Sequence, residues 1–176
     1  MKSKNIANAY VATVSFIYFL VILLLSYLPS NVWGDGVLSF FDEVNSFFPR
    51  YCLIKENVDF VESAIIGFFV SNAFYPFFLL FAFWIFPAPD EERMKSMISK
   101  DSGVLGFYVI VCFVFALCIP LYLPGAPGSG PSGRFNYFVF GSKFGFSLGL
   151  FLLRFSSAFF FVAAFHYIQA IRIKLN

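Results

Sequence analysis

Phe144 to Ile171 reads FGFSLGLFLLRFSSAFFFVAAFHYIQAI, a run of 28 residues that contains a single Lys, Arg, Asp or Glu, namely Arg154. A helix that spans the hydrocarbon core of a bilayer needs about 20 predominantly apolar residues. This stretch therefore predicts a membrane-spanning helix that carries one arginine near its middle.

The composition of the whole chain has the same character. Of its 176 residues, 60% are hydrophobic, 12% are charged and 29 are phenylalanine, and the mean hydropathy is +0.80. Soluble domains are about half apolar and about a quarter charged, so this chain has too few charges to cover a water-facing surface. The composition excludes a soluble globular enzyme and predicts one small membrane domain.

Three further apolar runs lead to an all-α architecture, a bundle of four transmembrane helices in one domain covering residues 1–176. The predicted spans are about 10–28, 63–86, 103–123 and 144–171. The first run is longer than the apolar region of a signal peptide, about 7 to 15 residues, and no A-x-A cleavage pattern follows it, so it is interpreted as a retained helix.

Lys and Arg residues are distributed unequally between the connecting segments. The two termini and the loop 87–102 hold seven of them, whereas the loops 29–62 and 124–143 hold four. Because cytoplasmic segments carry the excess of Lys and Arg, both termini are predicted to be cytoplasmic and the other two loops external. In a prokaryote the protein would be a multi-pass protein of the inner membrane.

Two connecting segments have helical patterns. Val37 to Phe48 places apolar residues at helical spacing around two acids, which predicts a short amphipathic helix lying at the outer membrane surface or serving as a docking face. The cytoplasmic loop places acids early and lysines late, which suits a helix dipole and predicts a second short helix. The stretch Pro124 to Gly133, PGAPGSGPSG, is expected to be a turn-rich connector.

Arg154 lies about ten residues, or about 15 Å, into the last span, close to the bilayer midplane. A charge at that depth costs at least about 2.5 kcal/mol, so it is expected to face the bundle interior, to pair with another group or to snorkel. The predicted buried polar cluster, or partner-binding site, comprises Arg154, Asn72, Ser71, Ser156 and Glu62, with Tyr75 as a further candidate.

Glycines recur every four residues around the start of the last span, at Gly141, Gly145 and Gly149. Small residues allow helix backbones to approach closely in lipid. They predict a helix-packing face, and the neighbouring helix could belong to the same chain or to another.

Catalytic and cofactor sites find no support in the residues. The chain has one histidine, His166, so a bis-His haem or a His-based metal site cannot form within one protomer. No G-x-S-x-G nucleophile motif and no phosphate-binding loop are present. No cofactor, metal or nucleic-acid partner is expected, and the expected partners are membrane lipid and another protein in the membrane.

The layout resembles that of the colicin A type of four-helix inner-membrane immunity proteins, which block pore-forming toxins by meeting their helices in the bilayer. The likeness covers most of the chain and consists of its size, four spans, both termini inside, a longer first outer loop and a second outer loop before the last helix. It implies recognition of a toxin's pore-forming segment by exposed helix faces and outer loops, with Gly141, Gly145, Gly149 and Arg154 as contacts. The alternatives are a small accessory or assembly subunit of a larger membrane complex and, third, an oligomeric transporter or channel.

Overall fold

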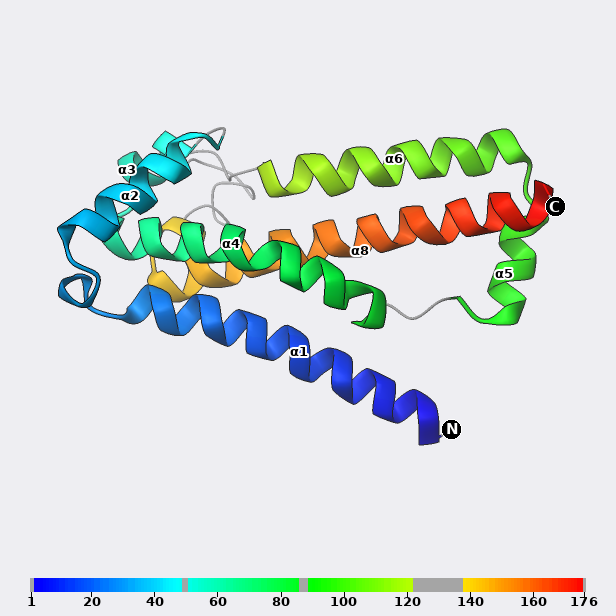
Figure 1. The fold of residues 1–176 in the computed structure, drawn as a ribbon, viewed down its shortest axis with the longest axis horizontal. Helices are drawn as coiled ribbons and strands as arrows, with labels where there is room; N and C mark the ends of the chain where they lie inside the picture. The colour runs from blue at the N-terminus through cyan, green and yellow to red at the C-terminus, as the bar shows by residue number, and fades with distance from the viewer. Residues whose placement is uncertain (1, 49–50, 86–88, 122–137, 176) are drawn as a thin grey trace.

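The computed structural model describes residues 2–48, 51–85, 89–121 and 138–175, and every regular element within these ranges is helical. Four long helices run along one axis of an elongated molecule (Figure 1). They are α1 (Lys2–Tyr27), α4 (Val61–Ile85), α6 (Ser102–Leu121) and α8 (Lys143–Leu175). The prediction of an all-helical membrane-type fold is confirmed at this level.

Three of these helices are long and apolar enough to cross a membrane. The qualifying segments are Val61–Phe83, Ser102–Ile119 and Lys143–Leu175. In α1 the described apolar part, Thr13–Tyr27, is shorter, although the helix itself has 26 residues. Compared with the predicted spans, α1 begins eight residues earlier, at Lys2 rather than residue 10, and α8 continues to Leu175 rather than ending at residue 171.

The short helices lie at opposite ends of the bundle. The 3-10 turn η1 (Ser30–Val32) and the helices α2 (Asp35–Ser46) and α3 (Tyr51–Asn57) occupy one end, and α5 (Glu91–Ile98) occupies the other, together with the start of α1 and the end of α8 (Figure 1). Both chain ends therefore lie at the same end of the molecule. Most of the predicted loop 124–143, including its glycine-rich stretch, lies outside the described residues.

The core is centred on α4 and α8. Helix α1 packs on both of them, whereas α6 packs chiefly on α8. Fully buried side chains in the core include Ile22, Phe68, Phe146 and Val162. Helix α6 has few buried side chains and leaves several large apolar ones exposed, including Phe107 and Ile110, which is the pattern expected of a helix that faces lipid.

Helix α2 covers most of the stretch predicted to be amphipathic, but its apolar face does not lie free at the membrane surface. Phe41 stacks on Phe69 of α4 with ring centroids 3.9 Å apart, and the buried Asn45 donates a hydrogen bond from Nδ2 to the carbonyl of Ile65 at 2.9 Å. The apolar face is thus packed against the bundle. Helix α3, which the sequence patterns did not predict, adds Tyr51 beside Phe68.

The predicted helix in the cytoplasmic loop corresponds to α5. Asp90 caps its N-terminus, because the carboxylate accepts a hydrogen bond from the backbone N–H of Arg93 at 3.0 Å. An ion pair between Glu91 and Lys95, at 2.8 Å, links successive turns. None of the residues of α5 is fully buried.

Candidate functional site

A buried polar network lies in the middle of the long helices, and Arg154 of α8 is its centre. The side chain of Arg154 is 2% exposed. Its Nη2 donates a hydrogen bond to Oδ1 of Asn72 on α4, and its guanidinium carbon lies 5.2 Å from the ring centroid of Tyr75. An amide oxygen and an aromatic face both stabilise a cation that has left water.

The acceptor on α4 is held in place by its own helix. Nδ2 of Asn72 donates to the carbonyl of Phe68 at 2.9 Å, and this bond turns Oδ1 toward Arg154. Asparagine can do both at once because its amide carries separate donor and acceptor atoms. The amide therefore reaches the arginine in one fixed orientation.

A second branch of the network runs from Tyr75 across α8 to α6. The Tyr75 hydroxyl is hydrogen bonded to Oγ of Ser157, and that hydroxyl donates to the carbonyl of Ala116 at 2.6 Å. Since Ser157 has one hydroxyl proton and gives it to Ala116, Tyr75 must be the donor to Ser157. The chain of bonds ties α4, α8 and α6 together.

The remaining long helix joins through Tyr18 of α1. Its hydroxyl donates to the carbonyl of Ser71 at 2.9 Å, in the turn of α4 that precedes Pro76. Pro76 has no N–H, so the carbonyl that lacks its helical donor is that of Asn72, four residues earlier. The bond from Tyr18 to the adjacent carbonyl of Ser71 ties α1 to the same turn of α4. Each of the four long helices thus contributes to one connected set of polar contacts.

The predicted cluster residues do not all belong to this network. Arg154, Asn72, Ser71 and Tyr75 do. Ser156 is half-buried beside it, and the serine that bonds Tyr75 is its neighbour Ser157. Glu62 is exposed in the first turn of α4, about 15 Å along the helix from Asn72, so it lies apart from the cluster.

The glycines predicted to form a helix-packing face, Gly141, Gly145 and Gly149, do not contact another long helix in this way. A side chain at Gly145 would collide with the backbone carbonyl of Phe138, and a Cβ at Gly149 would lie 3.2 Å from both methyl groups of Val139. These two glycines therefore accommodate the segment that leads into their own helix. Gly141 is exposed in a bend before α8 begins.

A close helix approach occurs at a glycine that the sequence patterns did not single out. A Cβ at Gly67 of α4 would collide with Oγ of Ser26 on α1. Ser26 is 1% exposed and donates its own proton to the carbonyl of Ile22 at 2.6 Å. This small-residue contact is the crossing point of α1 and α4.

A second polar cluster closes the end of the bundle formed by α2 and α3. Lys55 donates to Oδ2 of Asp42 and Tyr51 donates to Oδ1, each at 2.7 Å. Partial burial would raise the pKa of Asp42, but the hydrogen bonds from Lys55 and Tyr51 and the lysine charge outweigh it and lower that pKa. Burial, together with the bond to Asp42, raises the pKa of Tyr51.

The chemistry of the central network is structural and electrostatic. It holds a buried cation in the middle of the bundle and connects four helices. Within the described ranges, no three His, Cys, Asp or Glu side chains gather as metal ligands would. Comparison with protein-family models, with curated proteins and with solved structures gave no match.

Proposed function

We propose that this chain is a non-enzymatic, four-span integral membrane protein that recognises the helices of another protein in the bilayer, as an immunity protein that blocks a pore-forming bacterial toxin. In this proposal α1 also crosses the membrane, which brings the number of spans to four, and both termini are cytoplasmic. The α2–α3 end then faces outward, toward the periplasm if the membrane is a bacterial inner membrane.

The topology is supported by helix length and by charge. The 26 residues of α1 extend about 39 Å, which exceeds the roughly 30 Å hydrocarbon core. The two chain ends and α5 lie together (Figure 1), and these segments hold the excess of Lys and Arg. That arrangement supports an even number of spans.

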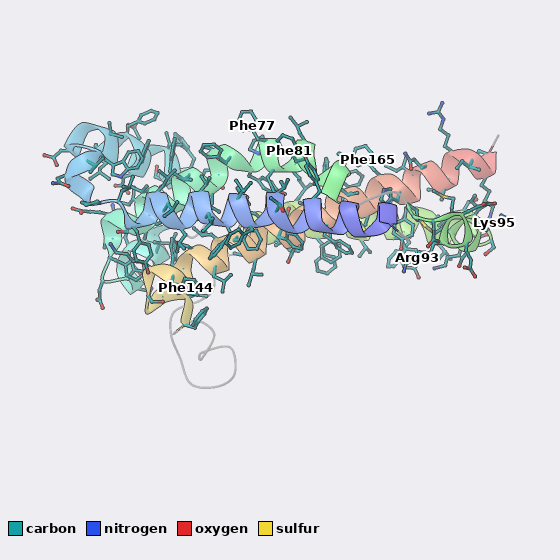
Figure 2. All side chains as sticks on the ribbon, turned by 90° about the horizontal axis from the view of Figure 1, so that it is seen from below. Phe77, Phe81, Arg93, Lys95, Phe144 and Phe165 are labelled. Atoms are coloured by element: carbon teal, nitrogen blue, oxygen red, sulfur yellow. The ribbon has the colours of Figure 1, made fainter. Side chains whose placement is uncertain are left out.

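One observation carries the recognition proposal: the Arg154 network is directed inward, whereas α4 presents an aromatic stripe outward. Phe74, Phe77 and Phe81 follow one another at helical spacing and are 44%, 61% and 47% exposed. Figure 2 shows Phe77 and Phe81 projecting from the side of the bundle. Aromatic side chains dominate the energetics of interfaces, so this stripe is the surface that we assign to the toxin's helices.

A toxin challenge tests the function. Cells that express the chain should survive the pore-forming toxin encoded beside it, and equal killing with and without the chain would contradict the proposal. The double variant Phe77→Ala and Phe81→Ala should accumulate normally and lose protection. A matched double variant on α6, Phe107→Ala and Ile110→Ala, should retain it, because those exposed side chains lie on a different face.

Cysteine labelling tests the topology separately. Cys52 of α3 and Cys118 of α6 are exposed, so the test starts from a Cys118→Ala background. There a membrane-impermeant maleimide should label Cys52 in intact cells with a permeable outer envelope, and adding Cys52→Ala should remove that labelling. A Ser99→Cys substitution after α5, made in the background that lacks both exposed cysteines, should react only after the membrane is disrupted. Labelling of both positions from the same side would contradict the four-span arrangement.

A second function is favoured by α6, which packs chiefly on α8 and leaves Phe107, Ile110 and Leu117 each more than 60% exposed. A helix held by one neighbour could dock on another subunit, so the alternative is an accessory or assembly subunit of a larger complex. Purification in mild detergent would then recover stoichiometric partners. Transport ranks third, because Arg154 is hydrogen bonded inside the bundle. Ion flux through the protein in liposomes would support transport.

A further inference from the structure

A cavity of about 510 Å³ lies between α5 and α8, at the end of the molecule that holds both termini. Its size is within the range of small-molecule sites, about 300 to 1,000 Å³. Helix α5 has no fully buried residue, although it packs on α8. The helix therefore covers this part of α8 without filling the space beneath it.

The wall of the cavity has both apolar and polar side chains. The apolar ones include Met97 of α5 together with Phe159 and Val162 of α8. The polar ones are Arg93 and Ser96 of α5 and His166 and Tyr167 of α8. A ligand that matches both kinds of side chain is amphiphilic, since a free inorganic anion would leave the apolar side chains without a partner.

The charge of the lining favours an anion. Arg93 is the one Lys or Arg among the residues that line the cavity, and none of these residues is an acid. Of the nearby acids, Glu91 pairs with Lys95 and Asp90 caps the helix at the backbone of Arg93, while Glu92 is exposed and is not among the residues that line the cavity. Arg93 is an exposed residue, and a guanidinium is suited to a phosphate group.

The position of the cavity along the bundle matches the level of lipid headgroups. Tyr167 stacks on Tyr108 with centroids 5.3 Å apart, and Lys100 lies 4.9 Å from the Tyr108 ring. Tyrosine and lysine gather where a membrane meets water. Figure 2 shows Arg93 and Lys95 at this same end of the molecule.

We propose that the α5–α8 cavity binds one anionic phospholipid from the surrounding leaflet, with the headgroup phosphate at Arg93 and an acyl chain against Val162, Phe159 and Met97. Basic pockets beside transmembrane helices are the general form of sites for anionic headgroups. The site lies in the cytoplasmic leaflet if the proposed topology holds, and lipid binding does not depend on toxin recognition.

The test uses the full chain purified in mild detergent and measures bound lipid by native mass spectrometry. Phosphatidylglycerol and phosphatidylcholine with identical acyl chains are the two probes. We expect retention of one phosphatidylglycerol in preference to phosphatidylcholine. Arg93→Gln should weaken phosphatidylglycerol binding about fivefold and leave phosphatidylcholine unaffected.

Two further variants make the test specific. Lys95→Gln removes the same charge from the same helix at a residue outside the cavity lining, and should leave binding unchanged. Ala163→Leu adds volume to the wall and should lower retention of both lipids. Thermal unfolding in detergent checks that each variant is folded.

Three outcomes would overturn the proposal. Equal retention of the two lipids by the unaltered chain would remove headgroup selection, and equal losses in Arg93→Gln and Lys95→Gln would show attraction by overall charge alone. Displacement of phosphatidylglycerol by millimolar inorganic phosphate would indicate a free-anion site. None of these results bears on protection from a toxin, so the two proposals fail separately.

Discussion

Nη2 of Arg154 on α8 donates a hydrogen bond to Oδ1 of Asn72 on α4, in the middle of the two helices. Their sequence positions differ by 82 residues, so only the folded bundle brings them together. An arginine that is 2% exposed depends on such acceptors, because removing one side of a buried charged contact leaves the charge uncompensated.

Replacing Asn72 by alanine should therefore be costly. We expect Asn72→Ala to lower the free energy of unfolding by about 3 kcal/mol, measured by equilibrium unfolding in mixed micelles. Asn72→Asp keeps an acceptor at the same position, so it should lower the free energy of unfolding by less than Asn72→Ala does. Asn31→Ala, which alters an exposed residue of η1, serves as the control, and equal effects of Asn72→Ala and Asn31→Ala would contradict the role of the contact.

The two adjacent serines of α8 offer a matched comparison. Ser157 accepts from Tyr75 and donates to Ala116, so Ser157→Ala should cost about 1 to 3 kcal/mol by leaving buried partners unsatisfied. Ser156→Ala should be close to neutral. A double-mutant cycle of Ser157→Ala with Tyr75→Phe should show coupling, and strictly additive losses would mean that the two hydroxyls do not act together.

The sequence predicts some features of the fold and of the polar network better than others, because they depend on different kinds of information. Hydropathy located the long helices, and matching depth paired Arg154 with Asn72. Depth does not fix the direction around a helix: adjacent residues differ by about 100°, which is why depth indicates Ser156 although Ser157 makes the bond. Glycine spacing indicated that a neighbouring segment packs closely at Gly145, but it did not indicate that this segment is the one containing Phe138.

Tyr18 and Gly67 were missed for related reasons. Tyr18 lies in an apolar run as an ordinary aromatic residue, and its role depends on a backbone carbonyl of a different helix, that of the buried Ser71. Gly67 is a lone glycine, and its importance comes from Ser26 on the helix that crosses it. In both cases the decisive partner is distant in sequence, so no local pattern reveals it.

The contact at Gly67 predicts a specific rescue. Gly67→Ala should destabilise the protein, because the new methyl group collides with Oγ of Ser26, and the double variant with Ser26→Ala should recover part of the loss. A methyl group at Gly106 of α6 would meet no neighbouring helix or side chain within 4 Å, so Gly106→Ala should be neutral or stabilising by up to about 1 kcal/mol. Unfolding midpoints in detergent compare these variants with the unaltered chain, and destabilisation by Gly106→Ala equal to that by Gly67→Ala would contradict the crossing.

The Asp42 cluster at the end of the bundle predicts a pH window for local stability. The pKa of Asp42 is lowered on folding, so its contribution is present above the unfolded pKa of about 3.9 and is lost as pH falls through the folded value. The pKa of Tyr51 is raised, so its contribution is present below about 10 and is lost as pH rises further. The packing of α2 and α3 on α4 should therefore weaken at both extremes.

Trp33 reports on this region, because its ring lies 5.8 Å from that of Phe41 on α2. In a Trp84→Phe background, the fluorescence of Trp33 should change at acid pH before the helical circular dichroism of the bundle does. Asp42→Asn should remove the change in Trp33 fluorescence at acid pH, which is the acid limb of the pH profile. Asp35→Asn, a change at an exposed acid of the same helix, should leave this limb intact. An acid limb that persists in Asp42→Asn would show that some other group links the docking of α2 to pH.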